Sequence, residues 1–148
     1  MSYAWRISNY EDLKGFGGLI AEGRWHPLGQ RVVYLSEHPA LALLEVMIHL
    51  EIDHEDLPDS FKLLKVKIPD ELNLDNDVQL PKNWQDDKFV TQKLGLDWLA
   101  EANTPLLRVP SVILPNSFNY LLNPIHPAAQ KIEIEDVISF PFDDRLVS

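Results

Sequence analysis

The sequence predicts a single domain of the α+β class. A chain of 148 residues, 45% hydrophobic and 24% charged, is long enough to bury one core and too apolar to be disordered. Its strand-like and helix-like segments are interspersed, without the regular strand–helix repeat of a doubly wound sheet. Because no internal repeat, low-complexity tract or linker divides the chain, residues 1–148 are expected to form one unit.

Two strands joined by a glycine-rich loop are expected near the N-terminus. Residues 3–7 form the first strand candidate, with Arg6 inside it. Residues 8–18 are loop-like and end in Gly15-Phe16-Gly17-Gly18, whose spacing does not match a phosphate-binding or dinucleotide-binding motif. The β-branched run at residues 31–35 predicts the second strand.

A helix is expected directly after the second strand. Ser36 is a plausible N-cap, and Pro39 suits the first turn, where its missing N–H goes unused. Nearly every residue from 40 to 48 is apolar, which predicts a helix buried almost all round. Glu45 lies inside this run, where a carboxylate is unfavourable unless it is paired, hydrogen-bonded or protonated.

The rest of the chain is predicted to add further strands and two short helices. Residues 61–68 alternate, with Leu64, Val66 and Ile68 on one face. The other strand candidates are residues 106–109, 112–114, 119–122 and 132–142, the last with Ile138, Phe140 and Phe142 on one face. Helices are expected at residues 89–94 and 96–102, with a break at Gly95.

The remaining segments are predicted to be irregular. Residues 51–58 are acidic and expected to be solvated. Residues 69–87 are polar, contain prolines, and read as a long connection and a candidate flap. The chain from Asp143 onward is expected to be a tail.

Composition excludes several classes of function. A net charge of −10 disfavours general binding to nucleic acid; it is the charge of a well-solvated surface or of one that meets a basic protein. The absence of cysteine removes disulfides, thiolate nucleophiles and cysteine-based zinc sites, and the five histidines lack metal-ligand spacing, so no metal is predicted. Without an apolar run long enough for a membrane or an N-terminal signal, the chain is expected to be soluble and cytoplasmic.

Two blocks of sequence carry a resemblance to a known family. Gly23-Arg24-Trp25, Val33-Tyr34 and Ala42-Leu43-Leu44-Glu45 resemble the core signature of the RES-domain family, and Pro110-Ser111 followed by residues 119–127 forms the second block. The resemblance implies a fold similar to ADP-ribosyltransferases, with small mixed or antiparallel sheets and short helices flanking an NAD cleft. Family members are toxins of bacterial toxin–antitoxin pairs that act on NAD.

The resemblance assigns catalytic roles to Arg24, Tyr34 and Glu45. Arg24 would face the NAD anion, and Tyr34 would pack on the nicotinamide side. Glu45 would stabilise the ribosyl cation as nicotinamide leaves, as carboxylates do in glycosidases. Structural alternatives stay open: a buried ion pair of Glu45 with Arg24 or Arg6, and a core role for the Tyr34 ring with its hydroxyl satisfied.

The resemblance also assigns three substrate-binding residues. Arg6 would join Arg24 in binding the pyrophosphate or a phosphate co-substrate. Ser111 would help to hold substrate or phosphate, and Asn119 could bind an amide, although asparagines also cap strand ends and turns. His26 stands where many members have asparagine; it is interpreted as a structural histidine and left out of the catalytic set.

The implied function is a toxin of a type II toxin–antitoxin system. It would consume NAD+ by cleaving the nicotinamide–ribose bond, by phosphorolysis or hydrolysis, and so arrest growth. NAD+ would be the substrate, with inorganic phosphate as a candidate co-substrate and no permanently bound cofactor. The expected partner is an antitoxin with an Xre-like helix-turn-helix region, and a homodimer within that complex is an open alternative. Other readings are a protein ADP-ribosyltransferase toxin, an RNA-cleaving toxin and an inactive binding module.

Overall fold

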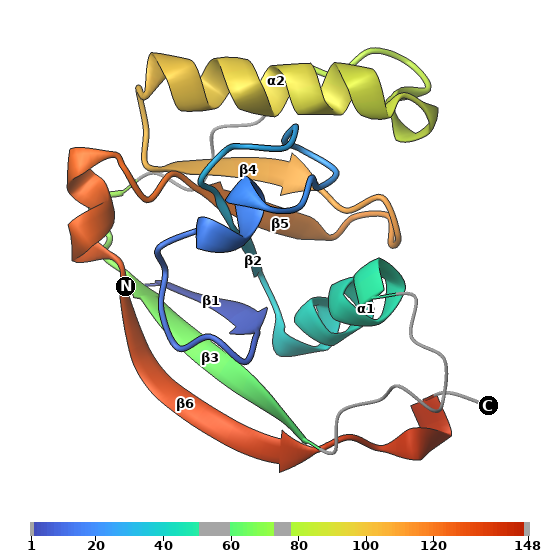
Figure 1. Ribbon diagram of the computed structural model, residues 1–148, viewed down its shortest axis with the longest axis vertical. Helices are drawn as coiled ribbons and strands as arrows, with labels where there is room; N and C mark the ends of the chain where they lie inside the picture. Colours follow the sequence, from blue (N-terminus) through green and yellow to red (C-terminus); the bar gives the residue numbers. More distant parts are fainter. Residues whose placement is uncertain (1, 51–59, 73–77, 147–148) are drawn as a thin grey trace.

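The protein forms one six-stranded antiparallel sheet with two α-helices, as seen in a computed structural model that describes residues 2–50, 60–72 and 78–146. The sheet order is β4-β5-β2-β1-β3-β6 (Figure 1). The strands are β1 (Ser2–Ile7), β2 (Val33–Ser36), β3 (Ser60–Ile68), β4 (Leu106–Pro110), β5 (Phe118–Leu122) and β6 (Glu133–Pro141). The helices are α1 (Pro39–Leu50) and α2 (Lys88–Glu101). The predicted α+β class is confirmed, and the strands join in a single sheet.

The two faces of the sheet are packed differently. Alternate residues of the central strands, among them Leu35 and Val66, form the largest buried cluster, which the short helix at Pro127–Lys131 closes. On the other face α2 packs over β4 and β5 through Trp98, while α1 packs beside β1 through Ala42 (Figure 1). The helices therefore cover separate halves of one face.

The α2 helix is continuous, so the predicted break at Gly95 is wrong. Asp87 caps its N-terminus by accepting a hydrogen bond from the Val90 amide, and the helix ends at Ala102, whose φ of 51° is left-handed. Gly95 is in the helix because it packs against a neighbouring segment: a Cβ atom there would lie 1.7 Å from the Trp25 carbonyl oxygen. A tertiary contact, not local helix breaking, accounts for this glycine.

The α1 helix is less buried than predicted. Leu41 and Ala42 are buried, but the side chains of Leu44 and Ile48 are 39% and 62% exposed. The helix packs on the sheet along one stripe only, so an apolar composition did not translate into burial all round. Ser36 is also not its N-cap.

The N-terminus of α1 is capped by a different side chain from the one predicted. His38 Nδ1 accepts from the Ala40 amide at 3.0 Å, while Ser36 ends β2 and donates to Asn119. Pro39 is the first helical residue, as expected.

Three irregular segments complete the comparison with the sequence. Residues 112–114 are not a strand; they belong to the turn between β4 and β5, which is closed by a bond from the Ser111 amide to the Ser117 carbonyl. The predicted connection at 69–87 contains the short helix η3 (Trp84–Asp86), and the predicted tail begins with another, Asp144–Leu146. The acidic segment 51–58 lies outside the described residues. Within the described ranges, neither helix is both long and apolar enough to cross a bilayer.

Candidate active site

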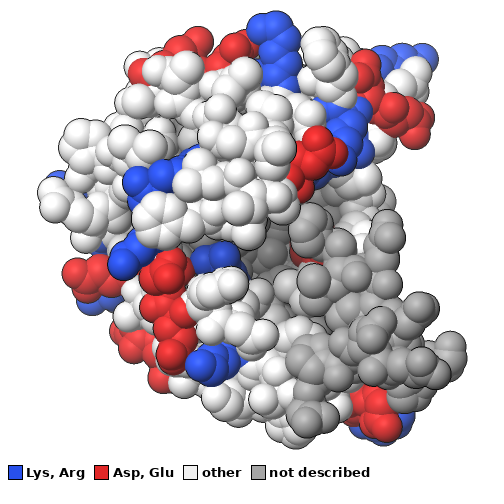
Figure 2. Space-filling view, viewed as in Figure 1, with Lys and Arg blue, Asp and Glu red and all other residues white. Residues whose placement is uncertain are grey.

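A cavity of about 410 Å³ opens on the helix-bearing side of the sheet. Its walls come from β1, β2, α1 and the loop of residues 17–26. The face shown in Figure 2 is hollowed near its centre, and acidic and basic side chains are interspersed over its described surface. Five of the six predicted site residues line this cavity: Arg6, Arg24, Tyr34, Glu45 and Asn119.

Glu45 is held by two neutral donors. Its Oε1 atom accepts from Ser111 Oγ and from Asn119 Nδ2, both at 2.8 Å. Asn119 is fixed in turn, because its Oδ1 accepts from Ser36 Oγ at 2.7 Å. Among the described residues no arginine forms an ion pair with Glu45, so the structural alternative of a buried pair with Arg24 or Arg6 is not observed. Within those residues the carboxylate is oriented in the cavity wall without being neutralised by a cation.

Ser111 lies behind Glu45 and does not line the cavity. Its buried hydroxyl donates to the carboxylate and accepts from the backbone amides of Ile113 and Leu114 at 3.1 and 3.3 Å. A hydroxyl whose oxygen already accepts from two amides, and whose residue does not line the cavity, is poorly placed to attack a substrate there. The structure therefore gives Ser111 a contact that orients Glu45, where the sequence predicted contact with substrate.

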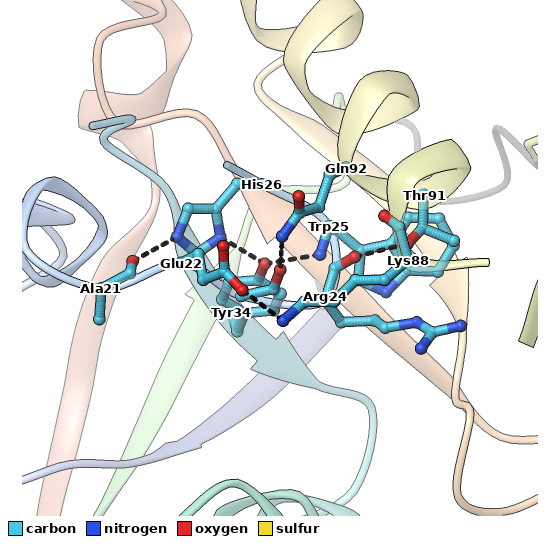
Figure 3. Close-up of polar contacts among 10 residues, drawn as sticks. Ala21, Glu22, Arg24, Trp25, His26, Tyr34, Lys88, Thr91 and Gln92 are labelled. Carbon is cyan, nitrogen blue, oxygen red and sulfur yellow. Dashed lines mark hydrogen bonds and ion pairs between the residues drawn. The ribbon is translucent and has the colours of Figure 1, made fainter. Parts of the chain in front are cut away.

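Tyr34 lines the cavity, and its hydroxyl is hydrogen-bonded within the loop that carries Trp25 and His26 (Figure 3). The hydroxyl accepts from the Trp25 amide at 3.0 Å and lies 2.6 Å from His26 Nδ1. His26 Nε2 lies 2.9 Å from the Ala21 carbonyl oxygen. Because a carbonyl only accepts, Nε2 carries a proton, and in the neutral imidazole Nδ1 then accepts from the Tyr34 hydroxyl. In that state the hydroxyl hydrogen is engaged by His26 and is not available to a ligand.

His26 is a hydrogen-bonded histidine, as its interpretation as a structural residue expected, but its partner Tyr34 was not predicted. Its side chain is only 4% exposed, and it lines the cavity from the loop that carries Arg24. No sequence signal links His26 to Tyr34, because the pair forms only when the loop folds back over β2.

Removing the Tyr34 hydroxyl should destabilise the fold in a pH-dependent way. Burial raises the pKa of Tyr34 above its ordinary value, and the Trp25 amide only partly offsets this. At pH 8, Tyr34→Phe should lower the free energy of unfolding by about 1–3 kcal/mol, because the Trp25 N–H is left without its acceptor. Above about pH 10 the unfolded tyrosine ionises before the folded one, so the wild type loses stability that the variant never had.

Urea unfolding at pH 8 and pH 11 measures this difference. We expect the difference in free energy of unfolding between wild type and Tyr34→Phe to be smaller at pH 11 than at pH 8. A gap that stays constant or widens would contradict the buried, neutral state of the hydroxyl. The other tyrosines are common to both proteins and cancel in the comparison.

In the described part of the chain, Arg24 contacts neutral groups only. Its Nη2 atom donates to the backbone carbonyls of Trp84 at 2.9 Å and Gln85 at 2.5 Å, and the guanidinium lies 5.9 Å from the Trp84 ring centre. Within the part of the chain that is described, its buried Nε has no hydrogen-bond partner. Figure 3 shows the side chain extending away from the pair of Tyr34 and His26. A cation without a carboxylate partner and with an unused donor suits an anionic ligand.

The loop that carries Arg24 is fastened to one face of α2 (Figure 3). Four consecutive loop residues meet helix residues spaced three, one and three positions apart, which share one helix face. Glu22 pairs with Lys88 at 2.5 Å, the Gly23 carbonyl accepts from Gln92 at 2.9 Å, the Arg24 carbonyl accepts from Thr91 at 2.6 Å, and the Trp25 carbonyl abuts Gly95. The helix thus fixes the backbone on which Arg24 and His26 stand.

Arg6 is the second cation of the cavity wall. It is largely buried, and its Nη1 donates to the Asp12 carbonyl oxygen at 3.0 Å. Burial lowers the pKa of Arg6, and the Asp12 charge acts in the opposite direction. A guanidinium stays charged at neutral pH even so. The cavity wall therefore contains two arginines, Arg6 and Arg24, and two glutamates, Glu45 and Glu22, of which Glu22 is paired with Lys88.

Comparison with known proteins decides the family. Residues 3–143 match the RES domain. The chain belongs to the RES domain family. This confirms the resemblance seen in the sequence, and the match spans both blocks that carried it.

The similarity to relatives covers almost the whole RES chain. The chain is 46% identical over 144 residues to a protein of Pseudomonas putida named Toxin Res, covering 96% of this chain and 97% of that one. It is 36% identical over 155 residues to a Sphingobium protein named Prs ADP-ribosylating toxin, covering 97% and 95%. A chain in the crystal structure of the Mycobacterium tuberculosis MbcT–MbcA toxin–antitoxin complex has the same fold, with a TM-score of 0.76 at 14% identity over 95% of this chain and 84% of that one.

The described part of this RES domain contains no cluster of metal-ligating side chains. Among residues 2–50, 60–72 and 78–146, no three histidine, aspartate or glutamate side chains gather as they would around an ion. The chemistry considered below uses the cavity side chains alone.

Proposed function

We propose that this RES protein is the toxin of a toxin–antitoxin pair and that it cleaves the nicotinamide–ribose bond of NAD+. The observation that carries the proposal is Glu45, an oriented carboxylate in a cavity wall that also contains Arg6 and Arg24. Relatives named Toxin Res, at 46% and 34% identity, support the toxin role.

The reaction needs negative charge beside the ribose. When the bond from C1′ to the nicotinamide nitrogen breaks, its electron pair leaves with nicotinamide and positive charge develops on the ribose. A fixed carboxylate near the ribose stabilises that charge more in the transition state than in the ground state. Water or phosphate then attacks C1′, which yields ADP-ribose with release of a proton or ADP-ribose 1-phosphate.

The two arginines are suited to bind the other half of the substrate, the pyrophosphate. The pyrophosphate of NAD+ carries two negative charges, and a guanidinium binds such oxygens with two donors at once. Among the residues that the structure describes, Arg24 has an unused buried Nε and only neutral partners, so exchanging carbonyls for phosphate oxygens would strengthen its hydrogen bonds. Arg6, already desolvated in the cavity wall, would supply the second cation.

Product analysis with two arginine variants tests the proposal. Purified chain is incubated with NAD+, with and without phosphate, and products are identified by mass spectrometry. We expect nicotinamide with ADP-ribose or its 1-phosphate. We also expect KM to rise at least about tenfold in Arg24→Ala and less in Arg24→Lys, which keeps the charge but loses the fork. RNA breakdown with NAD+ intact would favour the RNA-cleaving alternative, and no turnover of either substrate would favour an inactive binding module.

Protein ADP-ribosylation is the second candidate, favoured by the relative named Prs ADP-ribosylating toxin. The same carboxylate would serve it, because only the nucleophile that attacks C1′ differs. Incubation with NAD+ labelled on its adenine ring, in the presence of cell extract, separates the two. Label in protein supports the transferase, and label confined to small molecules supports degradation.

An antitoxin that covers the cavity is the proposed partner. Ile20 lines the cavity and is 83% exposed, and its neighbours in the chain, Phe16 and Leu19, are exposed as well. Such a patch beside a site is typical of a protein interface. The related fold in the MbcT–MbcA complex supports a partner of this kind. An Xre-like DNA-binding region, a homodimer within the complex and a cytoplasmic location belong to the same proposal.

A further inference from the structure

His26 is a buried titratable group that the proposed reaction does not use. Its ring stands between the Tyr34 hydroxyl, 2.6 Å from Nδ1, and the Ala21 carbonyl, 2.9 Å from Nε2. The two contacts are asymmetric: one partner can only accept, so the other must donate. The arrangement is complete for the neutral imidazole with its proton on Nε2.

The space around the pair is too tight for another arrangement. A Cβ atom on Gly23 would lie 2.6 Å from the Tyr34 hydroxyl and 2.6 Å from His26 Cε1, so only glycine fits there. On the opposite side, a Cβ atom on Gly18 would lie 3.4 Å from His26 Nε2. The imidazole is enclosed on both sides and cannot turn away from the tyrosine without moving the loop.

We propose that neutral His26 is a positioning residue, which anchors Tyr34 in the cavity wall and makes cleavage of NAD+ decline when His26 is protonated. The inference rests on the proposed function for its kinetic consequence. The anchoring itself rests only on the contacts of His26, Tyr34 and Ala21.

Protonation of His26 would remove the acceptor from the pair. Nδ1 would then carry a hydrogen, and the Tyr34 hydroxyl would face two donors, the imidazolium and the Trp25 amide. Its own hydrogen would lose its partner in a buried site, which is unfavourable. The ring that lines the cavity would then be held by a different set of hydrogen bonds, with its own hydroxyl hydrogen unsatisfied.

Charged groups of the described chain act on His26 from several elements. In its own loop Glu22 interacts favourably with a charged His26, and the cavity that His26 lines also contains Arg6, Arg24 and Glu45. From α2, Lys88 pairs with Glu22 and reduces the influence of that carboxylate. From β2, Tyr34 contributes a neutral hydroxyl, and η1 (Phe16–Leu19) contributes no charge.

The test is the pH dependence of kcat/KM in wild type and His26→Asn. An asparagine carbonyl oxygen accepts from the Tyr34 hydroxyl at every pH, so it replaces the anchor without its titration. In the wild type we expect the rate to fall about tenfold per pH unit below the histidine range. In His26→Asn the rate at pH 8 should drop by no more than about tenfold, and the decline should move to below about pH 5, where carboxylates titrate.

Two results would overturn the proposal. One is a decline of kcat/KM at low pH in His26→Asn that matches the decline in the wild type. The other is the same decline in Tyr34→Phe, which has no hydroxyl to anchor. Both variants must show wild-type circular dichroism. A folded His26→Asn without measurable turnover at pH 8 would also overturn it, because the replacement acceptor should suffice.

An NMR measurement separates this inference from the proposed function. The imidazole nitrogens of ¹⁵N-labelled protein report which one carries the proton, without any turnover. At pH 8 we expect the Nε2–H form. We also expect the pH at which half of His26 is protonated to differ between wild type and Tyr34→Phe. The Nδ1–H form would overturn the anchoring whatever the activity. The Nε2–H form in a protein that leaves NAD+ intact would refute the proposed reaction while the anchoring stands.

Discussion

Replacing Glu45 by glutamine is expected to lower kcat for nicotinamide release by about 10²–10³-fold with little change in KM. The amide keeps the size of the side chain, and its oxygen can still accept from Ser111 and Asn119, which contact Oε1 in the wild type. Only the negative charge is lost, and that charge acts on the cation of the transition state. Initial rates of nicotinamide release, followed by chromatography, give both constants.

Ser111→Ala is the matched control for this prediction. It removes one donor to the carboxylate and leaves the Asn119 contact, so the loss in kcat should be smaller, about tenfold, the value of one hydrogen bond to a charged group. A loss in Ser111→Ala as large as in Glu45→Gln would point to a direct role for the hydroxyl. Wild-type rates in Glu45→Gln would remove the carboxylate from the reaction.

Replacing Gly95 by alanine is expected to destabilise the protein by about 3 kcal/mol, although alanine is the better helix former by about 1 kcal/mol. The new Cβ atom would lie 1.7 Å from the Trp25 carbonyl oxygen and 2.9 Å from its carbon, far inside contact distance. The backbones of α2 and of the loop cannot move apart without breaking hydrogen bonds such as the one from the Thr91 hydroxyl to the Arg24 carbonyl, which fastens the loop to α2. The steric term therefore outweighs the gain in helix propensity.

Gly17→Ala gives the control in the same chain. No atom lies within 4 Å of a Cβ placed there, and its φ is not positive, so stability should change by less than about 0.5 kcal/mol. Urea unfolding of the three proteins measures both effects. A Gly95→Ala protein as stable as wild type would show that α2 does not press on the loop as described.

The fold class and most of the site could be predicted because they depend on local patterns and a family signature. Alternation in residues 61–68 marked β3, and its Leu64, Val66 and Ile68 are fully buried. Arg24, Tyr34 and Glu45 are spread over a loop, a strand and a helix, and the structure brings them to one cavity. Their catalytic roles remain predictions.

What could not be predicted depends on contacts between distant segments. The partners of Glu45 lie 66 and 74 residues away in sequence. Sequence alone could not show these contacts, so an arginine was considered as the group that pairs with the carboxylate. Gly95 looked like a helix break because its reason is a loop 70 positions earlier that approaches too closely for a side chain. Exposure of Ile48 likewise depends on which elements cover α1, and composition does not give that.

The same limit explains His26. A lone histidine next to a proline gives no sign of its acceptor role, which exists only because Gly23 lets the loop close on the Tyr34 hydroxyl. Side chains that position others are found through coordinates, since their chemistry is set by a neighbour and not by their own sequence context.

Release of nicotinamide from NAD+ by the purified chain tests the central claim most directly. The account predicts stoichiometric nicotinamide and ADP-ribose, or its 1-phosphate when phosphate is present, at a rate that nearly disappears in Glu45→Gln. Intact NAD+ after prolonged incubation with folded wild-type protein, or equal rates for wild type and Glu45→Gln, would contradict it.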